Sequence, residues 1–269
     1  MLPVSAQAPR RNMPMRAKIS SAAAILGMVI LASPTLSVAE EAAAGSTTAQ
    51  KAAAAGGSSE MPGWVPPSRG STTAARLGAA TRSAGDDSLP RIEALVPQEA
   101  GWTLEEQPVL YWYLSKTTDV AVELALVRVE PLEQILKVTL PTPERAGIQR
   151  IRLADHGAQI DSGSSYQWLL KLVPNPKDRS YDRIVGGGIE RVEPSQSLSQ
   201  QLDSASPERR AHVLAGNGIW YDAIDDLSVR IDAAPGDRGL WNQRAHLFQQ
   251  VGLPEVDLES GAANGFQRR

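Results

Sequence analysis

The sequence predicts a mainly β protein with a smaller α-helical part: an antiparallel, immunoglobulin-like β-sandwich over residues 89–193, then a short tetratricopeptide-like helical segment over residues 194–256. In the first region, apolar residues alternate with polar ones over short stretches interrupted by Pro, Gly and Asp, which is typical of strands with one buried face. After Pro194 the apolar spacing becomes helical, and several residues recur with a period of 34. The chain has no cysteine, so the sandwich must be stabilised by a packed core rather than by disulfides.

About seven strands follow one another in the predicted sandwich, without a helical stretch between them. Residues 120–126 alternate Val and Leu with Ala and Glu, and residues 166–172 repeat this pattern with Tyr, Trp and Leu. Residues 109–114 are an unbroken apolar run, which suits a central strand. Closely spaced strands of this kind favour an antiparallel sandwich. The predicted strands are residues 92–96, 109–114, 120–126, 136–140, 151–153, 166–172 and 184–192.

Three helices are predicted after the sandwich. Ser206 supplies a capping hydroxyl for the first of them, Pro207 suits its first position, and Glu208 lies at the positive end of the helix dipole. Gly218 is expected to end this first helix. A second helix over residues 220–231 is broken by a Pro-Gly pair, and Asp237 is expected to cap a third.

The predicted helices contain an internal repeat of a repeat and a half. The 34-residue period is that of the tetratricopeptide repeat, and Trp241 falls where the first helix of such a repeat carries a tryptophan. A free-standing array normally needs at least three repeats, so we expect these helices to pack on the sandwich. The recurring pairs are Ala211 and Ala245, His212 and His246, Leu214 and Phe248, and Gly218 and Gly252.

Residues 1–39 have the pattern of a secretory signal peptide. Four basic residues precede an apolar stretch from Ile19 to Ala32, and the small residues Ser37-Val38-Ala39 then form a cleavage site. A membrane-spanning helix needs roughly 20 apolar residues, which this stretch does not reach. The pattern therefore predicts cleavage after Ala39, no membrane span in the mature chain, and a periplasmic or secreted location; an uncleaved membrane anchor is the alternative.

Residues 40–88 are predicted to be a disordered linker, and residues 257–269 a flexible tail. Ala, Gly, Ser, Thr and Pro dominate the linker, whose large apolar residues are few, chiefly Trp64, Val65 and Leu77. Such a composition buries too little apolar surface to offset the entropy of ordering the chain.

The charge of the mature chain disfavours nucleic acid as a partner. Residues 1–39 hold four basic and no acidic residues, so their removal takes the formal net charge from −3 to −7. A mildly acidic surface does not follow a phosphate backbone or an anionic membrane.

No catalytic or metal-binding constellation is apparent in the sequence. His156, His212 and His246 are the only histidines, and without cysteine they lack the clustered ligands of a zinc site. Asp178 and Asp182 have the spacing of a candidate carboxylate pair for glycoside hydrolysis, but neighbouring arginines would lower an acid's pKa rather than raise it, so we interpret this segment as a turn. The sequence predicts no enzyme activity, no cofactor and no metal.

Several motifs resemble those of domain of unknown function family 928. They include the run from Leu89 to Pro97, the aromatic Tyr111-Trp112-Tyr113 and, most specifically, Gly218-Ile219-Trp220-Tyr221-Asp222-Ala223. The resemblance extends from about Pro66 to Val256. It implies an exported bacterial protein and supplies no catalytic residues.

The function predicted from these observations is a non-catalytic module that binds a protein or peptide in the cell envelope. Stacked helix pairs of the 34-residue type usually present a concave surface to a partner. Trp220, Tyr221 and Trp241 are the candidate contact residues on the helices. For Trp220 we predict that it attaches the helices to the sandwich, and an exposed residue that dominates partner binding is the competing interpretation. The alternative is a sandwich that binds a carbohydrate or another envelope ligand through Trp102 and Trp112.

Overall fold

The computed structural model describes residues 60–67, 75–78, 89–253 and 256. The predicted signal peptide, the predicted tail and most of the predicted linker lie outside these residues. Among the described residues, no helix is long and apolar enough to cross a membrane.

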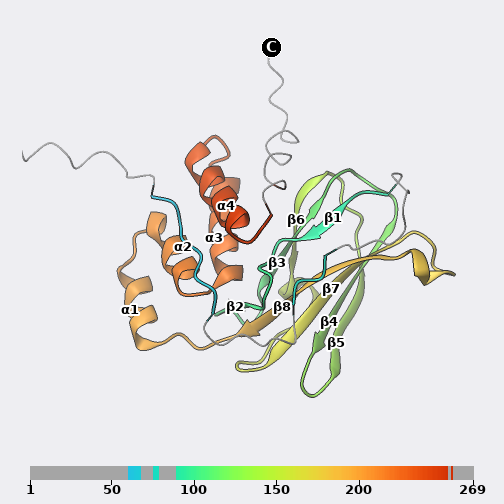
Figure 1. The fold of residues 1–269 in the computed structure, drawn as a ribbon, viewed down its shortest axis with the longest axis horizontal. Coiled ribbons are helices and arrows are strands. Elements are labelled where there is room, and N and C mark those ends of the chain that lie inside the picture. Colours follow the sequence, from blue (N-terminus) through green and yellow to red (C-terminus); the bar gives the residue numbers. More distant parts are fainter. Residues whose placement is uncertain (1–59, 68–74, 79–88, 254–255, 257–269) are drawn as a thin grey trace, which may run out of the picture. The chain divides into compact units, whose positions relative to one another are not determined.

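The fold is mixed α/β and contains two β-sheets (Figure 1). The first sheet has the order β1-β3-β6, and the second has the order β2-β8-β7-β4-β5. The strands of the first are β1 (Ile92–Ala94), β3 (Val109–Leu114) and β6 (Gly147–Arg152). Those of the second are β2 (Gly101–Thr103), β4 (Ala121–Arg128), β5 (Glu133–Leu140), β7 (Ser165–Val173) and β8 (Arg183–Arg191).

All seven predicted strands are present, and the structure adds β2. This strand has only three residues, too few to show an alternating pattern. It pairs with β8 in parallel, with Trp102 opposite Glu190, so the prediction of a wholly antiparallel arrangement is wrong at this edge. Every other pairing of the named strands is antiparallel. The immunoglobulin-like topology stays a prediction.

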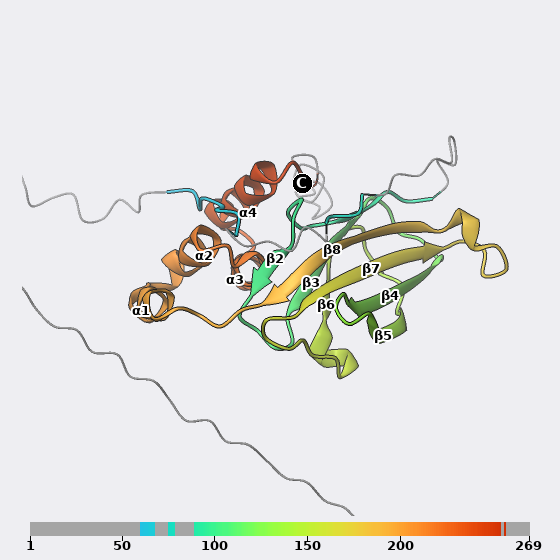
Figure 2. The ribbon, with the colours of Figure 1, turned by 60° about the horizontal axis from the view of Figure 1, so that its bottom comes forward.

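The buried faces of the strands follow the alternation in the sequence. Val122, Leu124 and Leu126 of β4 are fully buried, and their partners across β7 include Leu172, Leu170 and Trp168, which are buried too. The last five residues of β3 are all buried, so both faces of this strand are covered. Figure 2 shows β7 and β8 side by side as the longest strands.

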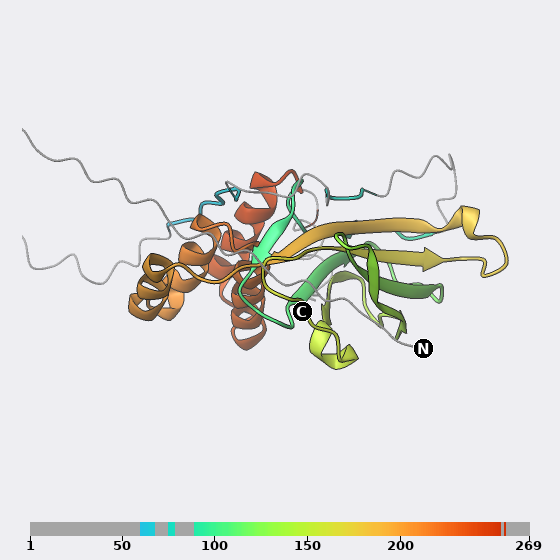
Figure 3. The ribbon, with the colours of Figure 1, turned by 90° about the horizontal axis from the view of Figure 1, so that it is seen from below.

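Four helices follow the strands: α1 (Gln196–Ser204), α2 (Pro207–Gly216), α3 (Trp220–Ala233) and α4 (Arg238–Gln250). They gather at the end of the strands where β2 lies (Figures 1 and 3). Each helix packs against the next, and α3 also packs against β2 and β3. Helix α1 was not predicted, because its only large apolar residues, Leu198 and Leu202, form a weak pattern.

The helix ends confirm two of the predicted signals and correct a third. Pro207 is the first residue of α2, and Asp237 caps α4 by accepting a hydrogen bond from the Gly239 N–H at 2.8 Å. Ser206, by contrast, makes no side-chain capping bond to α2. Its hydroxyl interacts with Glu208 instead, which lowers the pKa of that carboxyl.

The turns that follow α2 and α4 have the same geometry 34 residues apart. The Ile219 N–H donates to the Leu214 carbonyl at 3.0 Å, and the Leu253 N–H donates to the Phe248 carbonyl at 2.8 Å. The glycine in each turn is left-handed, with φ of 79° at Gly218 and 76° at Gly252. These positions require glycine because a Cβ is strained at such angles.

The prediction of a disordered linker is wrong for residues 60–67 and 75–78. The three large apolar residues noted there contact the folded body: Leu77 forms an antiparallel bridge with Gly186 of β8, and Trp64 and Val65 contact the helices. The composition of the stretch hid this, because a few well-placed residues and main-chain hydrogen bonds are enough to hold it.

Candidate functional site

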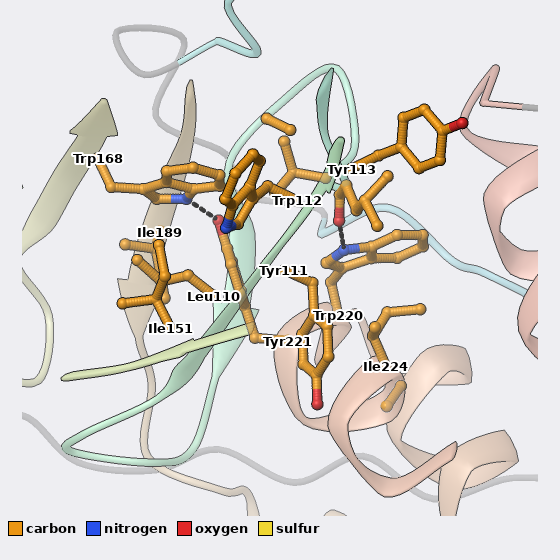
Figure 4. Close-up of a cluster of buried hydrophobic side chains, with 14 of the residues drawn as sticks. Leu110, Tyr111, Trp112, Tyr113, Ile151, Trp168, Ile189, Trp220, Tyr221 and Ile224 are labelled. Atoms are coloured by element: carbon orange, nitrogen blue, oxygen red, sulfur yellow. Dashed lines mark hydrogen bonds between the residues drawn. The ribbon is translucent and has the colours of Figure 1, made fainter. Parts of the chain in front are cut away.

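The first turn of α3 attaches the helices to the strands through buried hydrogen bonds. The Trp220 indole N–H donates to the Leu95 carbonyl at 2.9 Å, from a side chain with no exposed surface. The Tyr221 hydroxyl donates to the Gly188 carbonyl of β8 at 2.8 Å and accepts from the Trp168 indole N–H at 3.0 Å (Figure 4). Trp220 therefore joins the helices to the β-strand part of the fold, as predicted for an attaching residue.

Asp222 continues this attachment with a buried carboxyl group. It accepts a hydrogen bond from the Thr103 hydroxyl at 2.5 Å and another from the Leu104 N–H at 2.9 Å. Burial raises the pKa of Asp222 to about 6, and the two hydrogen bonds only partly oppose that rise. Asp222 thus links α3 to β2, and the stability of this link depends on whether the carboxyl group is charged.

Glycine at position 101 allows β2 to approach this turn closely. A Cβ placed on Gly101 would lie 3.0 Å from the Trp220 Cβ and 3.0 Å from the Tyr221 Cε2. The Gly218–Ala223 run and Gly101 therefore form one close-packed junction between helices and strands, which we call the α3 junction.

Residues 60–67, which we call the strap, lie along the outside of α2 and reach the end of α4. Glu60 lies beside Arg209 and His212, Val65 beside Ala215, and Pro67 beside Gly218. The strap therefore runs in the same direction as α2 (Figure 1).

Four hydrogen bonds hold the main chain of the strap. The Gln250 side chain makes two of them: its amide oxygen accepts from the Trp64 N–H at 2.6 Å, and its amide nitrogen donates to the Pro62 carbonyl at 3.1 Å. The His212 ring donates to the Glu60 carbonyl at 2.6 Å, and the Val65 N–H donates to the Ala215 carbonyl at 3.1 Å. Ala215 lies in the last turn of α2, where helix carbonyls lack partners within the helix.

Two side chains of the strap, Trp64 and Glu60, contact the same surface, and a third, Pro62, is buried. The Trp64 ring meets the Trp220 ring edge-on, with centroids 4.9 Å apart and an interplanar angle of 79°. Glu60 pairs with Arg209 at 2.6 Å. Trp220 in turn lies 6.3 Å from Phe248 of α4. We call Arg209, His212, Ala215, Trp220, Phe248 and Gln250 the strap surface.

Residues 75–78 connect the second sheet to the end of α4. The Arg76 guanidinium donates to the Val96 carbonyl at 3.2 Å and to the Val251 carbonyl at 3.0 Å, while its own N–H donates to Gln98. Burial lowers the pKa of Arg76, and Glu93 opposes that effect. The negative end of the α4 dipole also stabilises a cation beside Val251.

An acidic cleft of about 360 Å³ lies between the β2–β3 connection and helices α2 and α3. Its carboxylates have partners within the protein: Asp225 accepts from the Tyr111 hydroxyl at 2.7 Å, and Asp226 lies 3.6 Å from Arg230 and 3.8 Å from Arg210. Over the described ranges, no group of three or more His, Asp or Glu side chains is arranged to hold a metal ion.

The segment considered as a carboxylate pair for glycoside hydrolysis is a turn held by ion pairs. Asp178 accepts from the Ser180 N–H at 3.1 Å, and Arg179 pairs with Asp182 at 2.8 Å and with Glu123 at 2.7 Å. The hydrogen bonds from Ser180 lower the pKa of Asp178, so this carboxyl is ill suited to general-acid chemistry.

A second cleft, of about 640 Å³, lies where the chain passes from β5 to β6. Trp112, Gln149, Arg150, Arg152 and His156 are among its lining residues. Arg152 has no ion-pair partner within the part of the chain that the structure describes.

The tryptophans considered as contact residues do not form one exposed surface. Trp112 is only 2% exposed and Trp168 is fully buried, so neither offers a free ring face (Figure 4). Trp102 is half-buried against the core. Trp241 is half-buried as well, with its indole N–H bonded to the Pro235 carbonyl and the Arg244 guanidinium over its ring. Tyr221 is buried in the α3 junction.

Residues 77–260, more than half of the chain, match the Domain of Unknown Function family DUF928. The chain belongs to this family. The DUF928 match begins at Leu77, so it includes the bridge to β8 and the whole α3 junction, and it confirms the resemblance in the sequence. The strap precedes it. No curated protein matches the chain.

Gln250 and Arg209 were not predicted as contact residues, and Trp64 was predicted to lie in a linker. One signal was available: Trp64 lies between prolines, in a stretch otherwise nearly free of large apolar residues. A lone aromatic residue with rigid neighbours is typical of short peptide segments that dock on a folded surface.

Proposed function

We propose that this DUF928 protein is an exported, non-catalytic module of the cell envelope that binds an extended segment of a partner protein on its helices. The contact between the strap and the strap surface carries this proposal. There α2 and α4 hold eight consecutive residues of extended chain, largely through main-chain hydrogen bonds. In binding of this kind, main-chain hydrogen bonds supply affinity for an extended peptide and side-chain contacts supply the sequence preference.

The repeat geometry supports the same function. The identical turns after α2 and α4 favour a tetratricopeptide-like arrangement, in which the first helices of successive repeats line the surface that meets a peptide. The strap contacts α2 and α4, the two helices that the 34-residue period assigns to these first-helix positions. The β-strands, with their proposed immunoglobulin-like topology, serve as the support on which α3 is fixed.

A peptide titration tests the binding function. The full-length chain carrying Trp64→Ala would be titrated with a fluorescent peptide of the sequence of residues 60–67. We expect saturable binding, because the substitution removes the strap's ring from Trp220 and leaves the strap surface unchanged. Absence of binding by a variant that retains wild-type circular dichroism would contradict the proposal.

Export rests on the sequence of residues 1–39 and needs its own measurement. Expression of the full chain in a bacterium, followed by intact mass of the product in the periplasm, should give a chain that begins at Glu40. A product that retains residues 1–39 would favour the membrane-anchor alternative.

A second candidate function is the binding of a carbohydrate or another envelope ligand in the cleft between β5 and β6. The volume of about 640 Å³ and the unpaired Arg152 favour it, since an arginine on a cleft wall suits an acidic sugar. Arg152→Ala should then abolish retention on an acidic-glycan column, whereas the exposed Lys177→Ala should not. Equal retention of both variants would remove this candidate.

A further inference from the structure

We propose that the strap is an intramolecular stand-in for the partner segment. The strap surface then recognises extended peptides that carry a tryptophan near proline and an acidic residue four positions before it, and the partner must displace the strap to bind. This inference rests on the proposed function, since it names the ligand class of the same surface.

The extended conformation is selected by the clamp that Gln250 forms. Its side-chain amide spans two residues of the strap, accepting from the Trp64 N–H and donating to the Pro62 carbonyl. In an extended chain both groups point to the same side and can bond to Gln250 together. Within a helix they would already be hydrogen-bonded to other main-chain groups. Proline near the tryptophan lowers the entropy lost on binding, because it restricts the free peptide to extended conformations.

Two side-chain contacts supply the sequence preference. Trp64 is the main one, since its half-buried ring packs edge-on against Trp220, and aromatic residues dominate binding energies at protein interfaces. Glu60 is the weaker one, because its ion pair with Arg209 is half exposed on both sides. The ligand class is therefore an acidic residue, a proline two residues later, and a tryptophan after two more.

The strap surface remains intact when the strap leaves. Trp220 is held from the other side by its bond to Leu95, and Phe248 is fully buried in α4. The strap itself is loosely covered: Val65 is 53% exposed and Met61 is 37% exposed. Trp220 is therefore fixed by the protein and covered by Trp64, which makes it a preformed contact for an incoming tryptophan.

Tethering explains why the strap acts as a competitor. A segment of the same chain is present at an effective concentration that reaches millimolar for short flexible connections. A free peptide of equal intrinsic affinity must overcome this advantage. Weakening the strap should then strengthen the binding of the free peptide, an outcome opposite to that of damaging the surface.

The decisive experiment compares full-length variants by fluorescence anisotropy with the labelled peptide of residues 60–67. Trp64→Ala should bind it at least about 10-fold more tightly than the wild-type chain. Val65→Pro removes the N–H that donates to Ala215 without changing a helix, so it should also strengthen peptide binding. Agreement between the two variants would exclude a folding defect in the first as the cause. Gln250→Ala in the Trp64→Ala background should weaken binding, whereas the exposed neighbour Gln249→Ala should leave it unchanged.

Variant peptides separate failure of this inference from failure of the proposed function. Replacing the peptide tryptophan with alanine should weaken binding about 10-fold or more, and replacing its glutamate with glutamine only a few-fold. If the alanine peptide binds as well as the parent, the ligand class is wrong while peptide binding stands. If wild type and Trp64→Ala bind equally, the strap is no competitor. If no variant binds any peptide, the proposed function fails too.

Discussion

Trp220 contacts two segments of the chain in different ways. Towards the strands, the α3 junction uses buried side chains, each with a hydrogen bond to a fixed partner, and leaves Trp220 and Tyr221 with almost no exposed surface. Towards the strap, the contact uses main-chain bonds and an edge-on ring, and half of Val65 stays in solvent. The difference indicates that the α3 junction belongs to the fold, whereas the strap is an exchangeable layer. Stability measurements should therefore separate the two.

The largest effect is expected from Trp220→Ala. The substitution removes a fully buried indole and leaves the Leu95 carbonyl without its donor, so unfolding should cost about 3 to 5 kcal/mol less. Thermal unfolding followed by circular dichroism should shift to lower temperature as one transition, because helices and strands share this residue. Trp241→Ala, at a half-buried tryptophan outside the α3 junction, is the control. An unchanged midpoint for Trp220→Ala would show that Trp220 does not attach the helices.

Tyr221→Phe should have the next largest effect, about 3 kcal/mol, although it removes a single oxygen atom. Both the Trp168 N–H and the Gly188 carbonyl lose their partner in a place that water cannot reach, and each unsatisfied buried group costs about 1 to 3 kcal/mol. Chemical denaturation measures the loss. Tyr181→Phe, at a residue that is 58% exposed, should change the free energy of unfolding by less than about 0.5 kcal/mol.

Asp222 should make the stability of the α3 junction depend on pH. Its folded pKa of about 6 lies above the ordinary value, so the folded state binds the proton more tightly than the unfolded state. The contribution of this group to the free energy of unfolding therefore falls as pH rises from about 4 to about 6 and then stays constant, with a total loss of about 3 kcal/mol. Denaturation of wild type and Asp222→Asn at several pH values isolates this contribution. Parallel pH profiles for the two proteins would show that Asp222 is not the group responsible.

A contrast between long and short strands explains which parts of the fold the sequence could predict. β4 and β7 were predicted because one face of each strand is buried, which imposes a period of two on the sequence. β2 was not predicted because three residues are too few to show a period. Its pairing partner, β8, is also distant in the sequence. The Gly218–Ala223 run was noticed as a motif, and the structure gives the reason: Trp220, Tyr221 and Asp222 each bond to a different part of the strands.

The strap was missed for a different reason. The main-chain N–H and C=O groups of the strap make most of the hydrogen bonds that fix its position. These groups do not depend on the side chains of the strap, so they leave no pattern in its composition. The acceptor and donor of the clamp belong to Gln250, 186 residues away in sequence from Trp64. Sequence periodicity reports local structure and cannot reveal such a distant pair. Only the isolated Trp64 marked the segment.

The smallest effect on stability is expected from Trp64→Ala, and this is what most sharply separates the strap from the α3 junction. Trp64 lies against the same ring as the α3 junction, 4.9 Å from the centroid of Trp220, but its loss leaves the Leu95 bond and the core beneath it untouched. The remaining strap can also detach, so water rather than a cavity replaces the lost ring. Cavity formation is what makes large-to-small substitutions expensive, so we expect a loss of only about 1 kcal/mol. Chemical denaturation measures this loss, and acrylamide quenching of tryptophan fluorescence should rise as Trp220 becomes exposed. A loss as large as that of Trp220→Ala would mean that the strap is part of the core and cannot exchange with a partner.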